Sequence, residues 1–143
     1  HQRGDAVLVE LAQRVVNAVR GQVDTLARLG GEEFVLVLPE TPAAGARIVC
    51  EKILNAVSSE PFGSEGEDLV GITVSIGCAS FPHDGSTPQP LLRAADFAMY
   101  EAKARGRNCV VMAEELDAPA PESTSYSEGV EDVPPVARPS DAP

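Results

Sequence analysis

The sequence predicts an α+β fold in which helices cover a mostly antiparallel sheet. Three observations indicate this class. Amphipathic helical segments alternate with short apolar strands, a Gly-Gly pair separates two neighbouring strands, and two Thr-Pro pairs stand where helices are expected to begin. The chain has 143 residues, a length that suits one domain.

The first part of the chain predicts a helix followed by a hairpin. Residues 5–20 place apolar side chains at i, i+3 and i+4 spacing, which is typical of an amphipathic helix, and Asp5 stands at its start. Short apolar segments at 24–29 and 33–38 flank the Gly-Gly pair. Because glycine accepts the positive φ angles that tight turns need, we expect these segments to form a β-hairpin.

Two further helices are expected after the Thr-Pro pairs. Thr41-Pro42 offers an N-cap and a proline at the first helical position, and an apolar face follows it. Thr87-Pro88 repeats this signal before a third helix. We expect that helix to end at Gly106, since glycine is the usual residue just past a helix C-terminus.

The remaining strands complete the predicted domain. After a polar loop at 59–68, the residues of 69–81 are rich in β-branched side chains and predict one long strand, and 110–112 predict a last one. Beyond that strand Pro, Ser, Ala and Glu dominate, and such a segment cannot bury enough apolar surface to offset its ordering entropy. We therefore expect a domain over 1–112 and a disordered, acidic, Pro- and Ser-rich tail over 113–143.

Charge and composition disfavour several classes of protein. The formal net charge is −11, and residues 113–143 carry eight acids against one base, so there is no basic stripe to bind nucleic acid. No run approaches the roughly 20 apolar residues that a membrane span needs. The three cysteines lie far apart in apolar segments, which is typical of reduced, buried thiols in a cytoplasmic protein.

The Gly-Gly-Glu-Glu segment carries the first candidate chemistry. Gly30 and Gly31 have no Cβ and let a ligand approach the backbone closely. Glu32 and Glu33 follow at once, and on a strand their side chains should point to opposite faces. Mg²⁺ prefers carboxylate oxygens and takes one or two of them together with substrate phosphates. By itself, the segment fits either a metal site or an ordinary hairpin with two solvated glutamates.

Two cations near the end of the third predicted helix form the second candidate element. Lys103 and Arg107 are four residues apart, so on a helix they would share one face and could hold one polyphosphate. Cations at these positions would also compensate the negative end of the helix dipole. The spacing alone leaves both interpretations open.

Together with several flanking motifs, these elements resemble the GGDEF family of diguanylate cyclases. The run Gly30-Gly31-Glu32-Glu33-Phe34 is similar to the motif from which the family takes its name. The other similar stretches, in chain order, are His1-Gln2-Arg3-Gly4-Asp5 with Leu8, Val74-Ser75-Ile76-Gly77-Cys78-Ala79, Ala95-Asp96, Met99-Tyr100-Glu101-Ala102-Lys103 and Gly106-Arg107-Asn108. The resemblance covers nearly all of residues 1–112.

The resemblance implies a fold, a reaction and partners. The fold would be a nucleotidyl-cyclase or palm-like antiparallel sheet covered by helices. The family joins two GTP molecules into cyclic di-GMP, with one GTP in each of two domains that face each other as a homodimer. Mg²⁺ or Mn²⁺ assists the phosphoryl transfer. An upstream sensor or dimerisation module normally drives such a domain, and the expected location is the cytoplasm.

The resemblance also implies residue roles at the hairpin. Glu32 and Glu33 would be the catalytic and metal-binding carboxylates. Glu32 would act as ligand, as base, or as both, and Glu33 would be the second acidic position near the metal. Gly30 and Gly31 would admit the nucleotide close to the backbone.

Three further residues would bind substrate, as the resemblance implies. Asp5 would contact the guanine edge, although its place at the start of the first helix also suits an N-cap. Lys103 and Arg107 would hold the phosphates. A non-catalytic module that binds GTP or cyclic di-GMP without turnover is the alternative function, and the intact acidic pair with both cations favours the enzyme.

The chain departs from the family pattern at the first strand, at the product-binding motif and, with little consequence, at Leu29, where an aromatic residue usually precedes the glycines. The family's first strand, with an aspartate metal ligand, would precede His1, so we expect a truncated domain that folds poorly and is inactive alone. Many members also carry Arg-x-x-Asp before the glycines, where product binds and inhibits. Here Asp24 holds the Asp position, but Gly21 stands three residues earlier and Arg20 is one place off. We therefore expect weak or no product inhibition.

Overall fold

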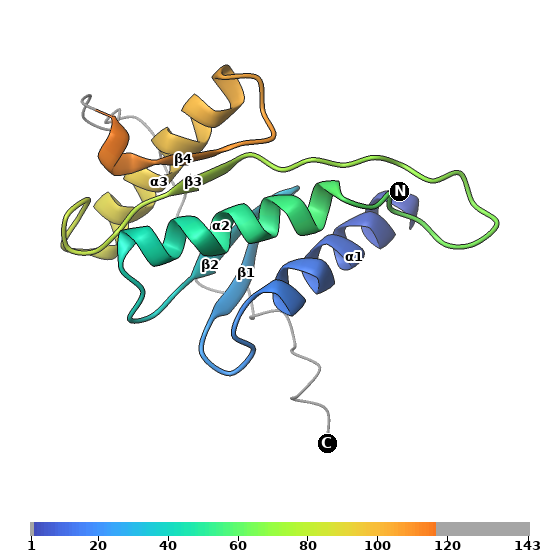
Figure 1. Cartoon of the computed structure of the whole chain (residues 1–143), viewed down its shortest axis with the longest axis horizontal. Helices are drawn as coiled ribbons and strands as arrows, with labels where there is room; N and C mark the ends of the chain where they lie inside the picture. Colours follow the sequence, from blue (N-terminus) through green and yellow to red (C-terminus); the bar gives the residue numbers. More distant parts are fainter. Residues whose placement is uncertain (1, 117–143) are drawn as a thin grey trace.

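The computed structural model of the chain describes residues 2–116, so His1 and most of the expected tail, 117–143, lie outside the described residues. The elements follow the predicted order of helix, strand, strand, helix, strand, helix and strand (Figure 1). They are α1 (Gln2–Ala18), β1 (Thr25–Gly30), β2 (Glu33–Val37), α2 (Ala43–Ser58), β3 (Ile76–Cys78), α3 (Pro88–Ala104), β4 (Val110–Met112) and the short 3₁₀ helix η1 (Ala113–Glu115). The predicted α+β class is therefore confirmed.

Helix α1 begins three residues earlier than the sequence predicted. Its buried side chains, Leu11, Ala12, Val15 and Ala18, recur on one face at helical spacing. Because the helix starts at Gln2, Asp5 lies inside its first turn. The alternative role of Asp5 as the N-cap is therefore wrong, and its carboxylate instead interacts favourably with the positive end of the helix dipole.

Strands β1 and β2 form the predicted antiparallel hairpin. Thr25 faces Val37 at the open end, and the register shifts between Arg28 and Gly30 just before the turn. Gly30 and Gly31 have φ angles of 143° and 53°, in the region that glycine adopts without a Cβ clash. The Gly-Gly signal in the sequence thus has a direct structural cause.

The other two strands form a second, separate sheet. β3 and β4 pair in parallel from Ile76↔Val110 to Cys78↔Met112, and within residues 2–116 no ladder joins them to the β1–β2 hairpin. The expected single, mostly antiparallel sheet is therefore two sheets of two strands. The predicted long strand over 69–81 is also wrong in its extent, since only Ile76–Cys78 finds a continuous partner strand and Val70 makes an isolated bridge with Phe62. A β-branched run becomes a strand only where a neighbour supplies hydrogen bonds.

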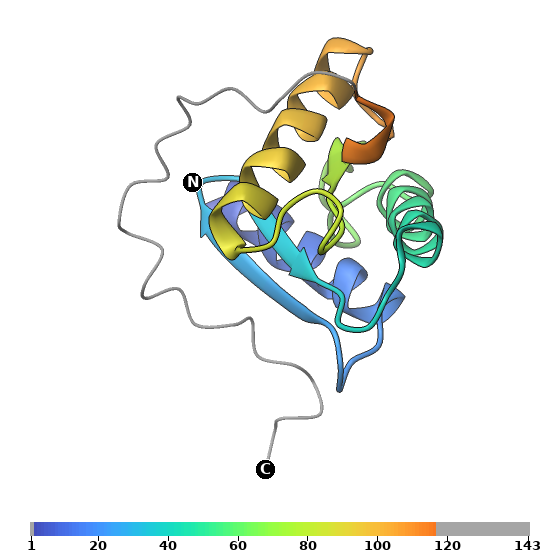
Figure 2. The ribbon, with the colours of Figure 1, turned by 90° about the vertical axis from the view of Figure 1, so that its left-hand side faces the viewer.

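The second sheet lies between α2 and α3 (Figure 2). Small residues allow α3 to come close: Ala98 and Ala102 are fully buried, and a Cβ on Gly77 of β3 would lie 2.0 Å from the carbonyl oxygen of Ala95. On the other side, Cys50 of α2 packs with Val110 and Met112 of β4. All three cysteines are free; Cys50 is buried, as predicted, whereas Cys78 and Cys109 are only partly buried.

Helix α3 ends before Arg107, which changes how the two predicted phosphate ligands are related. The helix stops at Ala104, and Gly106 and Arg107 both have positive φ angles, of 106° and 64°. The N–H of Arg107 then donates to the carbonyl of Ala102 at 3.0 Å, which closes the helix end. Lys103 and Arg107 therefore do not share a helix face, and the i, i+4 argument for them is wrong.

The described fold continues four residues past the predicted boundary near Met112. Residues 113–115 form η1, and Leu116 packs with Ala113 against the buried cluster around Val111. Glu115 is paired with Arg47 of α2, and its other carboxylate oxygen lies 3.9 Å from Arg105. The start of the acidic segment is thus attached to the domain.

Candidate functional site

An open cavity lies between the first turns of α1 and the tip of the β1–β2 hairpin. Its volume is about 650 Å³. The residues that line it are Gly4, Asp5, Val7, Leu8, Arg28, Gly31 and Glu32. Asp5 and Glu32, which are 27 positions apart in the chain, therefore contribute carboxylates to one cavity.

The hairpin tip presents one carboxylate and backbone polar groups to this cavity. Glu32 follows Gly31 in the turn and is exposed. Glu33 begins β2, opposite Gly30, and is exposed but does not line the cavity. The two adjacent glutamates thus differ in position, and because Glu32 lies in the turn and not on β2, the argument from strand alternation does not apply to the pair.

The wall formed by α1 is mixed in character. Asp5 supplies a carboxylate, Val7 and Leu8 supply apolar side chains, and Gly4 leaves the helix surface bare. A flat, partly apolar ring with polar groups on its edge would match this wall, because ligand sites are commonly apolar with a few polar groups that fix orientation. Of these wall residues, the sequence analysis had assigned a role only to Asp5.

Arg28 is a cavity residue that the sequence analysis missed. Its Nε and Nη2 both donate to the carbonyl oxygen of Gly31, at 2.8 and 2.5 Å. This two-point contact holds the turn that carries Glu32 and brings a positive charge to the cavity wall. The signal available in the sequence was a cation two residues before the first glycine, on a strand with otherwise mostly small or apolar residues.

The carboxylates at the hairpin fit a divalent cation such as Mg²⁺ if substrate supplies part of its shell. Residues 2–116 contain no group of three or more His, Cys, Asp or Glu side chains that could hold a metal ion. Glu32 and Glu33 therefore offer hard oxygen donors but too few of them for a cage made by this chain alone. Mg²⁺ commonly accepts one or two carboxylates and completes its shell with phosphates and water, so the donor set suits it.

Lys103 and Arg107 are not part of the cavity wall. Both are exposed, Lys103 on the last turn of α3 and Arg107 beyond its end. Of the residues assigned from the sequence, the structure brings together Asp5, Gly31 and Glu32 and leaves the two cations outside their cavity.

Comparison with curated proteins identifies relatives over the same region. The response regulator PleD of Caulobacter vibrioides is 44% identical over 112 residues, which cover 78% of this chain and 24% of that protein. Diguanylate cyclase A of Treponema denticola is 38% identical over 112 residues, which cover 78% of this chain and 30% of that protein. The chain thus spans about a quarter of the length of these relatives.

Solved structures show the same fold. A GGDEF domain of the Pseudomonas aeruginosa protein TpbB, also called YfiN, superposes with a TM-score of 0.72 at 37% identity, covering 79% of this chain and 65% of that one. The GGDEF domain of DgcB from Caulobacter crescentus, solved in complex with c-di-GMP, gives 0.69 at 34% identity, covering 80% of this chain and 67% of that one.

The family comparison covers the whole of the described site. The profile described as "Diguanylate cyclase, GGDEF domain" matches residues 1–109, which include the α1 wall, the hairpin and both cations of the α3 end. The motifs that suggested this resemblance in the sequence lie within the same span. The chain belongs to the GGDEF domain family of diguanylate cyclases.

Proposed function

We propose that this domain, in its full-length protein, condenses two GTP molecules into cyclic di-GMP. The observation that carries the proposal is the cavity that Asp5 of α1 shares with Gly31 and Glu32 of the hairpin. A guanine has N–H donors on one edge, which a carboxylate such as Asp5 accepts, while its ring faces suit Val7 and Leu8. Family membership supports the same reaction.

In the proposed reaction, the 3′-oxygen of one GTP attacks the α-phosphorus of the GTP in a facing domain. A P–O bond forms and pyrophosphate leaves. The 3′-oxygen of the second nucleotide then attacks the α-phosphorus of the first, which releases a second pyrophosphate and closes the ring. Glu32 would accept the proton of the attacking hydroxyl, would help to hold the divalent cation, or would do both, and Glu33 would support the cation from the start of β2. When bound, the cation neutralises phosphate charge and makes the attacking hydroxyl more acidic.

The cationic residues would act on the phosphates. Arg28 donates a hydrogen bond to the carbonyl oxygen of Gly31 and supplies a positive charge to the cavity wall. Lys103 and Arg107, outside that wall, would reach the outer phosphates, where charge-assisted hydrogen bonds are strong. Because one cavity accommodates one nucleotide, the reaction requires a second copy of the domain, and we propose a homodimer in the cytoplasm, driven by an upstream sensor or dimerisation module.

We also propose that the domain includes one more strand, before residue 1. The β1–β2 hairpin and the β3–β4 pair are not joined by a ladder, so an added strand could pair with an edge of each. Such a strand would bring the additional carboxylate that the metal site lacks. The 143 residues alone would then be inactive.

Among residues 2–116, no helix is both long and apolar enough to cross a membrane.

The test is GTP turnover by the full-length protein with Mg²⁺, with cyclic di-GMP measured by mass. Glu32→Gln should lower the rate at least about 100-fold, because it removes a charge that acts on the reacting atoms. Glu51→Gln, on the exposed surface of α2, is the matched control and should keep the rate. A well-folded protein that binds GTP yet forms no product would refute turnover and favour the binding module.

A further inference from the structure

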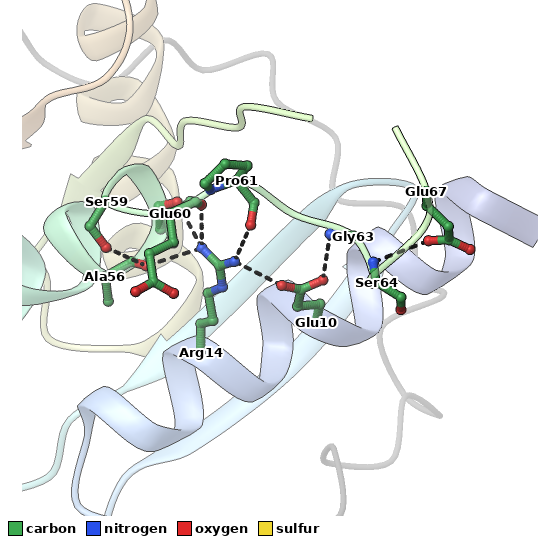
Figure 3. Close-up of polar contacts among 10 residues, drawn as sticks. Glu10, Arg14, Ala56, Ser59, Glu60, Pro61, Gly63, Ser64 and Glu67 are labelled. Atoms are coloured by element: carbon green, nitrogen blue, oxygen red, sulfur yellow. Dashed lines mark hydrogen bonds and ion pairs between the residues drawn. The ribbon is translucent and has the colours of Figure 1, made fainter. Parts of the chain in front are cut away.

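Arg14 of α1 makes an unusually dense set of contacts with the end of α2. Its Nη1 donates to the carbonyl oxygens of Val57 at 3.2 Å and Glu60 at 2.8 Å, and its Nη2 donates to that of Pro61 at 2.9 Å (Figure 3). The guanidinium carbon also lies 3.7 Å from the centre of the fully buried Phe62 ring. Arg14 thus donates both to a carbonyl in the last turn of α2, that of Val57, and to two carbonyls of the loop that follows it, those of Glu60 and Pro61.

Glu10 links this cation to the loop that follows α2. One of its carboxylate oxygens lies 2.7 Å from Nη2 of Arg14, and the other accepts the backbone N–H of Gly63 at 3.2 Å (Figure 3). The side chains of Arg14 and Glu10 are only 17% and 33% exposed, so water screens this pair less than a surface pair. We call Glu10, Arg14 and their carbonyl and N–H partners the α1 clamp.

The α1 clamp begins at the middle of the helix, at Glu10, and continues into its second half, where Arg14 lies among the buried residues in the chain. The buried residues of α1 are Leu11, Ala12, Val15 and Ala18, all in its second half. The cavity residues of α1 are Gly4, Asp5, Val7 and Leu8, all in its first half. Val7 and Leu8 pack against the same hydrophobic core but are only partly buried, so the core holds the cavity half of the helix less fully than the second half.

The loop after α2 also contacts the first half of α1 through hydrogen bonds. Besides the contact from Gly63 to Glu10, the carbonyl of Asp68 accepts a hydrogen bond from the side chain of Arg3. Phe62 and Val70 hold the two ends of the loop together through paired backbone hydrogen bonds, at 2.7 and 2.9 Å. The loop thus contacts α1 on both sides of Asp5 along the chain.

From this arrangement we propose that Glu10 and Arg14 are positioning residues for nucleobase recognition, because they hold the first turns of α1, and with them Asp5, at the hairpin. The inference rests on the proposed contact between Asp5 and guanine. Neither residue lines the cavity, so each acts through Asp5 and not on the substrate itself. Small displacements of a contacting group weaken a hydrogen bond steeply, so loosening the clamp should affect base selectivity first.

The experiment measures the preference for GTP over inosine triphosphate in the full-length protein. Inosine lacks the exocyclic amino group that a carboxylate at Asp5 would accept from. Arg14→Met and Glu10→Gln should each lower the preference in kcat/KM at least about threefold, through KM, with kcat at saturating GTP within about twofold of wild type. Arg47→Met, which removes an equally long cation on α2 away from the cavity, should leave the preference unchanged.

A double variant separates positioning from general loss of structure. If the clamp acts through Asp5, Arg14→Met should have no further effect on the base preference once Asp5→Asn is present. Glu10→Gln keeps the contacts between Arg14 and the carbonyls. If Arg14→Met does not fold, the base preference of Glu10→Gln therefore provides the test. An unchanged preference in both clamp variants would overturn the inference alone. A wild-type protein with no preference would overturn the Asp5–guanine contact, and the inference with it.

Discussion

Arg20 and Asp24 form a two-point ion pair at the start of β1. Nη2 of Arg20 lies 2.7 Å from Oδ1 of Asp24, and Nε of Arg20 lies 3.2 Å from both carboxylate oxygens. The same Nη2 donates to the carbonyl of Pro39 at 3.0 Å and to the hydroxyl of Thr41 at 2.9 Å. The hydrogen bond to Asp24 raises the pKa of Arg20. The pair thus joins the chain after α1 to the loop before α2.

Removing the Asp24 carboxylate should destabilise the domain. Its side chain is 1% exposed, and Oδ2 also accepts the backbone N–H of Arg20 at 2.8 Å. Asp24→Ala leaves that N–H and the guanidinium without their acceptor, so we expect the melting temperature of the full-length protein to fall by at least about 4 °C. Asp84→Ala removes a similar carboxylate cap, on the backbone N–H of Ser80 in another loop, and provides the comparison. An unchanged melting temperature in Asp24→Ala would show that the pair is dispensable.

Cyclic di-GMP should not inhibit the full-length protein. The spacing Arg-x-x-Asp is absent just before the Gly-Gly pair, and the Arg20 guanidinium already donates to Asp24, Pro39 and Thr41, so neither charge of the pair is available to a phosphate ligand. Initial rates of GTP turnover should stay constant when product is added at the concentration of GTP. Inhibition at low product concentration would contradict this prediction.

Two variants distinguish two causes of the insensitivity to product: the missing Arg-x-x-Asp spacing, and the existing ion pair between Arg20 and Asp24. A Cβ at Gly21 would meet nothing within 4 Å, so Gly21→Arg restores the spacing without a clash at the Cβ. We expect Gly21→Arg alone to remain insensitive, because Asp24 stays paired with Arg20. Gly21→Arg with Arg20→Gln should gain product inhibition, since the new cation and a freed carboxylate could then bind ligand together. Sensitivity in the single variant would mean that spacing alone decides.

Local patterns in the sequence predicted most of the elements. Leu11 and Val15 mark the buried face of α1, and Gly30-Gly31 mark the hairpin, because helical spacing and positive φ are properties of neighbouring residues. The prediction that Gly106 terminates α3 is confirmed, since the helix ends at Ala104, Arg105 is its C-cap and Gly106 follows with a positive φ.

Features that depend on distant partners could not be predicted in this way. β3 is short because only Ile76–Cys78 meets β4, and that pairing depends on topology. In the sequence, Arg14 is indistinguishable from one half of an i, i+4 surface pair with Glu10. Its carbonyl partners are 42 to 47 positions away in the chain, so no local pattern indicates them. The cavity is hidden from the sequence for the same reason: Asp5 and Glu32 meet only after α1 packs beside the hairpin.

Loss of a base contact should change the preference between nucleotides, whereas loss of a phosphate contact should change the KM of both nucleotides alike. Asp5→Asn should reduce the preference for GTP over inosine triphosphate about tenfold, since it weakens a charge-assisted hydrogen bond to the base. Lys103→Met and Arg107→Met should raise the KM of both nucleotides by the same factor and leave the preference unchanged, because these cations lie outside the cavity of Asp5. A changed preference in Lys103→Met would place that cation at the base.

Residues 1–143 alone should unfold without a cooperative transition and should form no cyclic di-GMP. Within residues 2–116 each of the two sheets has two strands and no ladder joins them, so both sheets leave backbone N–H and C=O groups at their edges without a strand partner. Circular dichroism during heating would test this, with a version extended by about 30 natural residues before His1 as the comparison, which is long enough for a strand and its connection.

The extended version should show a sharp transition and gain activity, since a strand between the two sheets would supply hydrogen-bond partners to both of their edges. Glu32→Gln in the extended version should keep the transition and lose the activity, which separates folding from chemistry. A cooperative transition in residues 1–143 would show that α2 and α3, packed on either side of β3 and β4, suffice to hold the fold. The added strand would then be needed for its carboxylate and not for stability.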